Sequence, residues 1–375
     1  MVAGESSGDL LGGLLLQSMR SRWPELQTFG IGGPAMQAQG FQSWWPSERL
    51  ALRGYLEVLP RFAELVHMRK LLGDRLLADR PELFIGIDAP DFNLDLERRL
   101  RSAGLKTVQF VSPAFWAWRA EKLPKLRQAV DLVLCIFPFE PALLESNDIA
   151  ARYVGHPLAS LIPLRPDQGA ARRALGLESA AEYVALLPGS RVTEVSHLAP
   201  RFLAAAALLT DLRPGLRFLL PAVATQYENL CRSVAESAMA SKVTVLRGQS
   251  HAALAACDVA LVASGTATLE AALFKRPMVI AYHMNWLSWQ VTQHKRRQPW
   301  VGLPNILCQE LVVPELLQRQ ATPQAMARAV LDWFDDPSRI ESLQRRFEQL
   351  HHDLKRDTSR LALDAIEELC ARPGS

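Results

Sequence analysis

A carboxylate that could act as a base stands at the end of one predicted strand. The segment GIDAPDFN, residues 86–93, follows a short apolar run and carries Asp88 at its turn. In parallel sheets such turns face the ligand, and a carboxylate there can accept a proton from an attacking hydroxyl if its surroundings set a suitable pKa. Asp91 is better explained as a cap of the next helix. The pattern therefore predicts Asp88 as a general base.

A short loop with the chemistry of a diphosphate receptor follows another predicted strand. Residues 187–191 read LPGSR, so backbone amides, the Ser190 hydroxyl and the Arg191 guanidinium stand together. These groups can neutralise a diphosphate and donate hydrogen bonds to it. The loop lacks the lysine and the length of a P-loop, so triphosphate hydrolysis is not indicated.

A third group of polar residues lies in the segment ASGTATLEAA, residues 263–272, after a buried apolar run. Gly265 and Thr266 stand where a helix begins, and the first amides of that helix could bind phosphate. Thr266 and Glu270 are four residues apart and share a helix face, so Glu270 could bind ribose hydroxyls. The alternative is that Glu270 is an ordinary solvated helix residue.

The fourth group is the N-terminal segment GESSGD, residues 4–9. Its glycines allow a close approach of the backbone, and Ser7 or Asp9 could cap the helix that follows. Glu5 has no capping duty at that spacing, although the start of a helix stabilises its charge. Glu5 is therefore a candidate functional residue.

Several common motifs are absent from the sequence. There is no Asp-x-Asp and no His-Glu-x-x-His, so neither a metal-bridged diphosphate nor a zinc hydrolase is predicted, and we expect no metal or other cofactor. The segment GIGG, residues 30–33, only approximates the dinucleotide fingerprint, which weakens a dehydrogenase interpretation. Glycosyl transfer remains, with basic and backbone groups neutralising the leaving diphosphate.

The elements that must position these groups alternate between short β-branched runs and longer helical patterns, as in the βαβ units of a parallel sheet. After a short opening strand, the predicted strands are 83–87, 107–111, 132–136, 183–187, 217–220, 243–246, 259–262 and 277–281. Prolines crowd residues 153–166 and indicate a linker. We predict two doubly wound α/β domains, over residues 1–160 and 161–344, with a C-terminal helix over about 345–375 that packs back on the first.

The composition fits this organisation. The 375 residues exceed one ordinary core, and 49% hydrophobic with 22% charged residues is typical of packed domains. The net charge of +3 is too small to indicate a nucleic-acid partner by itself. Scattered cysteines, the lack of a signal-peptide pattern and the lack of a long apolar run predict a cytoplasmic protein with peripheral membrane contact at most.

Five segments in chain order resemble the lipid-A-disaccharide synthase family: VAGESSGD at 2–9, GIDAPDFN at 86–93, SPAFWAWR at 112–119, LPGSR at 187–191 and LPN at 303–305. The resemblance covers nearly the whole chain and implies a GT-B fold, with two Rossmann-like domains and an interdomain cleft. It implies an inverting glycosyltransferase that joins UDP-2,3-diacylglucosamine to 2,3-diacylglucosamine 1-phosphate through a β-1,6 linkage and releases UDP. The implied partners are these two lipids and the cytoplasmic surface of the inner membrane, and a homodimer is compatible with the family.

The resemblance also implies roles for individual residues. The family's critical aspartate, arginine and asparagine fall on Asp88, Arg191 and Asn305, and its N-terminal acidic loop matches Glu5, Ser7 and Asp9. We expect Asp88 to activate the acceptor 6-hydroxyl, and Arg191 with Ser190 to stabilise departing UDP. Asn305 is expected to orient a sugar or phosphate.

Acyl chains on both substrates require an apolar surface on the domain that receives the acceptor. A stripe at helical spacing, beside several basic residues, meets this requirement: Leu56, Val58, Leu59, Phe62, Leu65 and Val66. Such a stripe is ordinarily part of a core. The acyl substrates instead favour contact with a membrane or with acyl chains.

Two other functions remain open from the sequence. A UDP-sugar 2-epimerase of similar architecture would also use a nucleotide cleft, but it would need neither the apolar stripe nor the Asp88 motif. A nonenzymatic, peripheral lipid-binding protein could retain the fold with an inactive nucleotide site. The presence of Asp88, Arg191 and Asn305 argues against that alternative.

Overall fold

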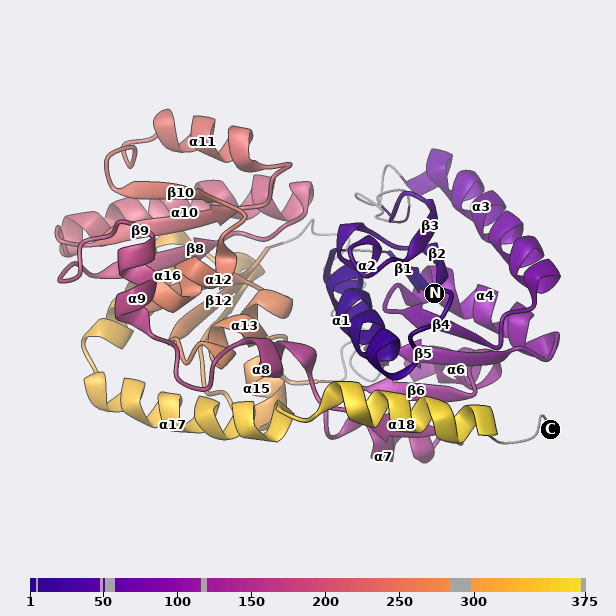
Figure 1. Cartoon of the computed structure of the whole chain (residues 1–375). Coiled ribbons are helices and arrows are strands. Elements are labelled where there is room, and N and C mark those ends of the chain that lie inside the picture. Colours follow the sequence, from indigo (N-terminus) through magenta and orange to yellow (C-terminus); the bar gives the residue numbers. More distant parts are fainter. Residues whose placement is uncertain (5, 48–49, 51–57, 116–119, 284–297, 372–375) are drawn as a thin grey trace. The chain divides into compact units, whose positions relative to one another are not determined.

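Two α/β units, each built on one parallel sheet, make up the chain (Figure 1). The computed structural model describes residues 1–375 except 5, 48–49, 51–57, 116–119, 284–297 and 372–375. Unit 1 consists of Met1–Ser160 and Asp353–Ser375, and unit 2 consists of Leu161–His352. The prediction of two doubly wound α/β domains is confirmed.

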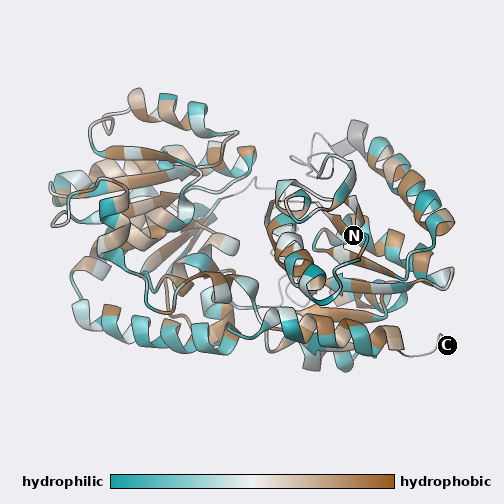
Figure 2. Ribbon diagram, in the orientation of Figure 1, coloured by the Kyte–Doolittle hydropathy of each residue, from teal (hydrophilic) through white to brown (hydrophobic). Residues whose placement is uncertain are grey.

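The sheet of unit 1 has the strand order β3-β2-β1-β4-β5-β6-β7, and all its neighbouring strands are parallel. Its strands are β1 (Val2–Ala3), β2 (Phe29–Ile31), β3 (Gln42–Trp45), β4 (Leu83–Ile87), β5 (Lys106–Phe110), β6 (Leu132–Cys135) and β7 (Ala151–Tyr153). Helices cover both faces, which is why the central strands are apolar at successive positions rather than at alternate ones. Figure 2 shows these strands as largely hydrophobic.

The helices of unit 1 are α1 (Ser6–Arg22), α2 (Pro34–Gln37), α3 (Val58–Asp79), α4 (Pro90–Ser102), the 3₁₀ turn η2 (Ala120–Lys122), α6 (Leu123–Ala129), α7 (Glu140–Glu145), α8 (Pro157–Leu161), which reaches the boundary with unit 2, and α18 (Thr358–Ala371). Helix α1 packs closely on the sheet because of a glycine: a Cβ atom on Gly12 would lie 2.8 Å from Cδ1 of Ile87 and 2.7 Å from Sδ of Met36. This close packing brings the start of α1 next to the end of β4.

The last helix of the chain belongs to unit 1. Helix α18 lies beside α1 and β5 (Figure 1). Arg22 of α1 forms ion pairs with Asp364 at 2.7 Å and with Glu367 at 2.9 Å. The ammonium of Lys106 in β5 donates to the carbonyl oxygens of Leu369 and Cys370, both at 2.8 Å.

Unit 2 has the strand order β10-β9-β8-β11-β12-β13, again parallel throughout. Its strands are β8 (Tyr183–Leu187), β9 (Arg217–Ala222), β10 (Val243–Arg247), β11 (Val259–Ala263), β12 (Met278–Tyr282) and β13 (Glu315–Leu317). Its helices are α9 (Gln168–Ala174), α10 (Val192–Leu212), α11 (Tyr227–Ala235), α12 (Ser250–Ala256), α13 (Thr266–Leu273), α15 (Leu303–Cys308), the 3₁₀ turn η3 (Gln318–Gln320), α16 (Pro323–Phe334) and α17 (Pro337–Leu354), which runs to the boundary with unit 1. Every residue of β8 and β11 is buried.

The eight strands predicted after the opening one are all confirmed, with ends shifted by one or two residues at most. The opening strand is β1, which lies between β2 and β4. Four short strands were not predicted: β2, β3, β7 and β13.

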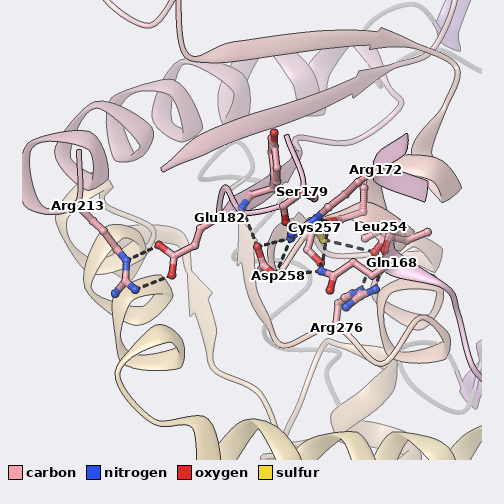
Figure 3. A network of polar contacts seen from close by, with 12 residues as sticks. Gln168, Arg172, Ser179, Glu182, Arg213, Leu254, Cys257, Asp258 and Arg276 are labelled. Carbon is pink, nitrogen blue, oxygen red and sulfur yellow. Dashed lines mark hydrogen bonds and ion pairs between the residues drawn. The ribbon is translucent and has the colours of Figure 1, made fainter. Parts of the chain in front are cut away.

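A network of polar contacts joins the amino ends of the strands in unit 2 (Figure 3). The carboxylate of Asp258, just before β11, accepts two bonds from Nη2 of Arg172, both at 2.8 Å. It also accepts from the backbone N–H of Tyr183 at 2.8 Å and from Nε2 of Gln168 at 3.0 Å. Because these groups come from α9, β8 and the turn before β11, the network fixes the start of the two central strands.

Replacing Asp258 tests the importance of this network for stability. Asp258→Ala leaves the buried Arg172 without its carboxylate and should lower the free energy of unfolding by about 3 kcal/mol. A suitable control is Glu178→Ala, because the Glu178–Arg217 pair at 2.7 Å is more than half exposed at both ends. The control substitution should lower the free energy of unfolding by less than about 1 kcal/mol. Urea unfolding followed by circular dichroism measures both, and equal losses would contradict the prediction.

Candidate active site

Each sheet has one place where the order of strands reverses. In unit 1 the chain builds β1, β2 and β3 outward in one direction and then returns to place β4 on the other side of β1. In unit 2 the reversal falls between β8 and β11. The four polar segments predicted from the sequence follow β1, β4, β8 and β11. Ligands of open parallel sheets bind at such reversals, beyond the carboxyl ends of the strands.

Asp88 follows β4 with an unusual backbone. Its φ is 51° and that of Ala89 is 45°, left-handed values that residues with a Cβ atom adopt rarely. The N–H of Asp88 donates to the carbonyl of Phe110 at 3.0 Å. Helix α4 begins two residues later, at Pro90, so the half-buried Asp88 lies beside the positive end of a helix. The turn therefore holds a carboxylate at the predicted place.

The N-terminal segment adjoins the Asp88 turn. A Cβ atom on Gly4 would lie 3.0 Å from Cβ of Ala89, so the loops after β1 and β4 are in contact. Ser7 is exposed near the start of α1. Glu5 lies outside the described residues, and its predicted contact with substrate stays a prediction.

Asp9 has a role inside the protein. It is 6% exposed, and its carboxylate accepts hydrogen bonds from the backbone N–H groups of Gly33 at 2.8 Å, Ala35 at 2.8 Å and Met36 at 3.1 Å. These N–H groups belong to the start of α2. The carboxylate thus caps a neighbouring helix rather than its own, and this contact gives no support to the predicted contact with substrate.

The loop between β8 and α10 presents the predicted diphosphate receptor. Gly189 has a φ of 110°, and a Cβ atom there would lie 2.6 Å from Oε2 of Glu194, so this position requires glycine. Ser190 and Arg191 are exposed. Nη1 of Arg191 lies 3.2 Å from Oε1 of Glu194, with the arginine side chain 60% exposed. The Glu194 side chain is only 17% exposed, but the guanidinium is mostly in solvent, so the pair contributes little and Arg191 can turn to a diphosphate.

The loop between β11 and α13 leads into a second helix, which begins at the same edge of the sheet. Gly265 has a φ of 145°, and a Cβ atom built on it would have no described heavy atom within 4 Å. Thr266, the first residue of α13, is exposed. One turn further on, Oε2 of Glu270 lies 3.6 Å from Nε2 of His251 in α12. A ribose bound by Glu270 would therefore lie close to His251 as well.

Sequence reasoning missed a basic group at this edge. Nη2 of Arg201 in α10 lies 3.2 Å from Nε2 of His283, which directly follows β12, and the rings of His197 and His283 are 5.8 Å apart. Burial, followed by the charge of Arg201, lowers the pKa of His283. The spacing of His197 and Arg201, four residues apart on one helix, was the available signal.

Asn305 makes all its described contacts within unit 2. It is fully buried, and its Nδ2 donates to the carbonyl of Val313 at 2.9 Å and to Oε1 of Glu315 at 2.8 Å. Its Oδ1 accepts from the N–H groups of Val312 at 2.9 Å and Val313 at 3.0 Å. The amide is thus saturated by the protein, and these contacts give no support to the expectation that Asn305 itself orients a sugar or phosphate.

The described part of the apolar stripe is divided between core and solvent. Leu65 of α3 packs against the core of unit 1, whereas Val66 is 39% exposed. Leu71 of the same helix, which was not part of the predicted stripe, is 43% exposed. Leu56 and the side chains of Val58, Leu59 and Phe62 lie outside the described residues. Leu65 was predicted to be part of a continuous apolar surface. It packs on the core instead, so it is not free to contact a membrane or an acyl chain.

A surface groove of about 650 Å³ lies between α3 and α4. Its lining combines Val66 and Leu96 with basic side chains from both helices: Arg69, Lys70, Arg98 and Arg99. Arg69 is paired with Asp95, which also lines the groove, at 3.0 Å. The groove between α3 and α4 therefore presents apolar and cationic side chains next to one another.

Two further properties concern the described part of the chain. It contains no helix long and apolar enough to cross a membrane. Nor does that part contain a cluster of three His, Cys, Asp or Glu side chains with which a metal ion could be held.

Solved structures of two activities share this fold. A glycosyltransferase from Rickettsia africae superposes with a TM-score of 0.60 at 11% identity, covering 100% of this chain and 98% of the other. A UDP-GlcNAc 2-epimerase from Neisseria meningitidis, bound to UDP-GlcNAc, gives 0.63 at 9% identity over 98% and 97%. At such identities the likeness shows the two-domain GT-B architecture alone.

The sequence itself discriminates between these activities. A lipid-A-disaccharide synthase of Albidiferax ferrireducens is 56% identical over 374 residues, which are 98% of this chain and 96% of the relative. The sequence model described as Lipid-A-disaccharide synthetase matches residues 1–366. With the polar loops of the family in place at both strand reversals, the chain belongs to the lipid-A-disaccharide synthetase family.

Proposed function

We propose that this chain transfers 2,3-diacylglucosamine from UDP to the 6-hydroxyl of 2,3-diacylglucosamine 1-phosphate, giving a β-1,6-linked disaccharide 1-phosphate and UDP. Membership of the family supports the activity. The observation that carries the assignment of residues is the position of the polar loops. One carboxylate stands at the strand reversal of unit 1, and two helix starts with a Gly-Ser-Arg loop stand at that of unit 2.

The proposed reaction is one displacement at the anomeric carbon of the donor. The acceptor O6 forms a bond to this carbon on the face opposite UDP, while the bond from the carbon to the phosphate oxygen breaks. Its electron pair leaves with UDP, and the hydroxyl proton passes to the carboxylate of Asp88. A single displacement inverts the anomeric centre, in accord with an α-linked donor and a β-linked product.

On the donor side, we assign the leaving group to the loops of unit 2. The Ser190 hydroxyl, the Arg191 guanidinium and the amides at Gly265 and Thr266 would stabilise the charge that develops on UDP. Glu270 would accept hydrogen bonds from the ribose hydroxyls. The exposure of Ser190, Arg191, Gly265 and Thr266 supports this assignment.

Asn305 is assigned an indirect role. Its Nδ2 contacts Oε1 of Glu315, and the same oxygen accepts from the N–H of Gly302 at 2.9 Å. The N–H of Val301 lies 2.9 Å from the other oxygen of Glu315. Asn305 is therefore proposed to fix the segment before α15 through Glu315, as a positioning residue rather than by touching substrate.

The alternatives are less well supported. A 2-epimerase has the same fold but needs no base for an acceptor hydroxyl, and the family match over residues 1–366 does not favour it. A coupled assay that supplies both acylated substrates and measures UDP and disaccharide together separates the functions. A transferase produces both in equal amounts, whereas UDP without disaccharide, or neither product, contradicts the proposal.

We also assign the membrane contact to α3. Lipid substrates reside in a bilayer. Val66, which lines the basic groove, and the exposed Leu71 of the same helix suit an anionic leaflet. The protein would then act at the cytoplasmic surface of the inner membrane.

The base assignment predicts a specific loss of turnover. Asp88→Asn should fold normally but lower kcat by about 10³-fold, because an amide cannot accept the proton. Asp91→Asn is the matched control: this neighbouring carboxylate is 70% exposed and pairs with Lys122 at 2.7 Å. Its kcat should change by less than about threefold. Near-normal turnover in purified Asp88→Asn would refute the assignment.

The diphosphate assignment predicts a loss of UDP affinity. Arg191→Ala should weaken UDP binding by about 10- to 100-fold, since a charge-assisted contact is removed. Arg217→Ala, an exposed arginine at the amino end of β9, should leave the affinity unchanged. Isothermal titration of the intact protein with UDP measures both. Equal affinities for the two variants would reject Arg191 as a ligand.

The membrane assignment predicts an effect confined to α3. Replacing Val66 and Leu71 together by Ser should lower binding to vesicles that contain anionic lipid by about tenfold, since two exposed apolar side chains are lost. Leu212→Ser removes a side chain that is 68% exposed at the end of α10 and should have no effect. Cosedimentation with liposomes measures the binding of both variants. Unchanged binding of the double variant would mean that the membrane contact is not made by Val66 and Leu71.

A further inference from the structure

Three residues with left-handed backbone angles stand at the carboxyl ends of β4 and β5. They are Asp88 (φ 51°), Ala89 (φ 45°) and Val111 (φ 75°). Such angles are unfavourable for any residue with a Cβ atom, and more so for the β-branched Val111. They persist only where surrounding contacts impose them. The turn that carries the candidate base is therefore held in place by its neighbours.

One buried amide reaches both strained turns. Nε2 of Gln109, in β5, donates to the carbonyl oxygen of Asp88 at 3.0 Å and to that of Val111 at 3.2 Å. Nδ2 of Asn93 donates to the same Asp88 oxygen at 2.9 Å. Gln109 and Asn93 are both fully buried. Two side-chain amides thus fix the peptide that follows the Asp88 side chain.

The orientation of the Gln109 amide depends on what its oxygen meets. With Nε2 directed at two carbonyls, Oε1 points away from them, and it is buried without a hydrogen-bond partner in the described part of the chain. Glu97 of α4, also fully buried, reaches the same place. A Cβ atom on Gly86 would collide with Oε1 of Glu97 and lie 2.8 Å from Oε1 of Gln109. Because residue 86 is glycine, both oxygens can lie where a side chain would otherwise stand.

Whether the Glu97 carboxyl can lie favourably next to Oε1 of Gln109 depends on whether that carboxyl is protonated. Burial raises the pKa of its carboxyl well above the ordinary value. A neutral carboxyl carries one O–H donor, whereas an ionised one would present only acceptors to the Gln109 oxygen. Both of its carboxyl oxygens are buried without a hydrogen-bond partner among the described residues.

We propose that Glu97 is a positioning residue for the transfer reaction: its O–H donates to Oε1 of Gln109 and so holds the amide that fixes the Asp88 turn. This proposal rests on the proposed role of Asp88 as the base. Without the donor, Oε1 of Gln109 stays buried and unsatisfied, and the amide holds the two carbonyls less firmly. The left-handed turn then relaxes, and the base moves relative to the acceptor hydroxyl.

Two substitutions of Glu97 and one control test the proposal. Glu97→Met removes the donor at similar volume and should lower kcat by about 10- to 100-fold, with KM for both substrates within about twofold, because a misplaced base slows chemistry rather than binding. Glu97→Gln supplies an N–H donor and should keep kcat within about threefold of the unchanged protein. Leu100→Ala, one turn further along the buried face of α4, should lower the melting temperature at least as much while keeping kcat.

The outcomes separate a positioning role from a structural one. A kcat for Glu97→Met equal to that of Leu100→Ala, or a kcat for Glu97→Gln as low as that of Glu97→Met, overturns the proposal. If Glu97→Met does not fold, Glu97→Asp serves instead, since it keeps the acid but withdraws it by one methylene. A loss of about tenfold then supports the role, and a kcat within about threefold rejects it.

The same measurements distinguish this proposal from the base assignment. Asp88→Asn with normal turnover would reject Asp88 as the base and the positioning role with it. Loss of turnover in Asp88→Asn, together with unchanged turnover in Glu97→Met, would reject the role of Glu97 alone.

Discussion

The candidate active site depends on how parallel strands must be connected. Each parallel pair needs a crossover, usually through a helix, so all carboxyl ends of a sheet lie at one edge. Where the order of strands reverses, the crossover helices leave on opposite faces and the edge between them stays open. The reversals lie between β1 and β4 and between β8 and β11. The placement of Asp88, Ser190 and Gly265 follows from this constraint more than from any single contact.

Much of the fold could be predicted because buried parallel strands leave a strong signal. The strands β8 and β11 are apolar at every position, and such runs cannot be solvated. Strands β3 and β7 had no such signal, since each lies at an edge of its sheet and its residues are half-buried or exposed. Short edge strands form because a neighbour offers a ladder of hydrogen bonds, a tertiary effect that their own residues do not encode.

The site shows where residue type stops being informative. Asp88, Asp9 and Asn305 were all candidate site residues from their motifs. In the structure Asp9 accepts from backbone amides near the start of α2, and Asn305 accepts from the amides of Val312 and Val313. Only the folded structure tells a buried cap from a side chain that faces the edge. The spacing of His197 and Arg201 could indicate a basic helix face, but the contact of Arg201 with His283 spans 82 residues of sequence and needs the folded structure. Motifs located the loops, and packing decided which side chains the loops present.

The return of α18 has a consequence for biosynthesis. Unit 1 is assembled from two chain segments separated by the whole of unit 2, and Arg22 and Lys106 have partners among residues 364–370. As the ribosome proceeds, unit 2 can complete its own core while unit 1 still lacks a helix against α1 and β5. The unit that is made first is thus completed after unit 2, and the nascent chain carries an uncovered apolar face until α18 has been synthesised.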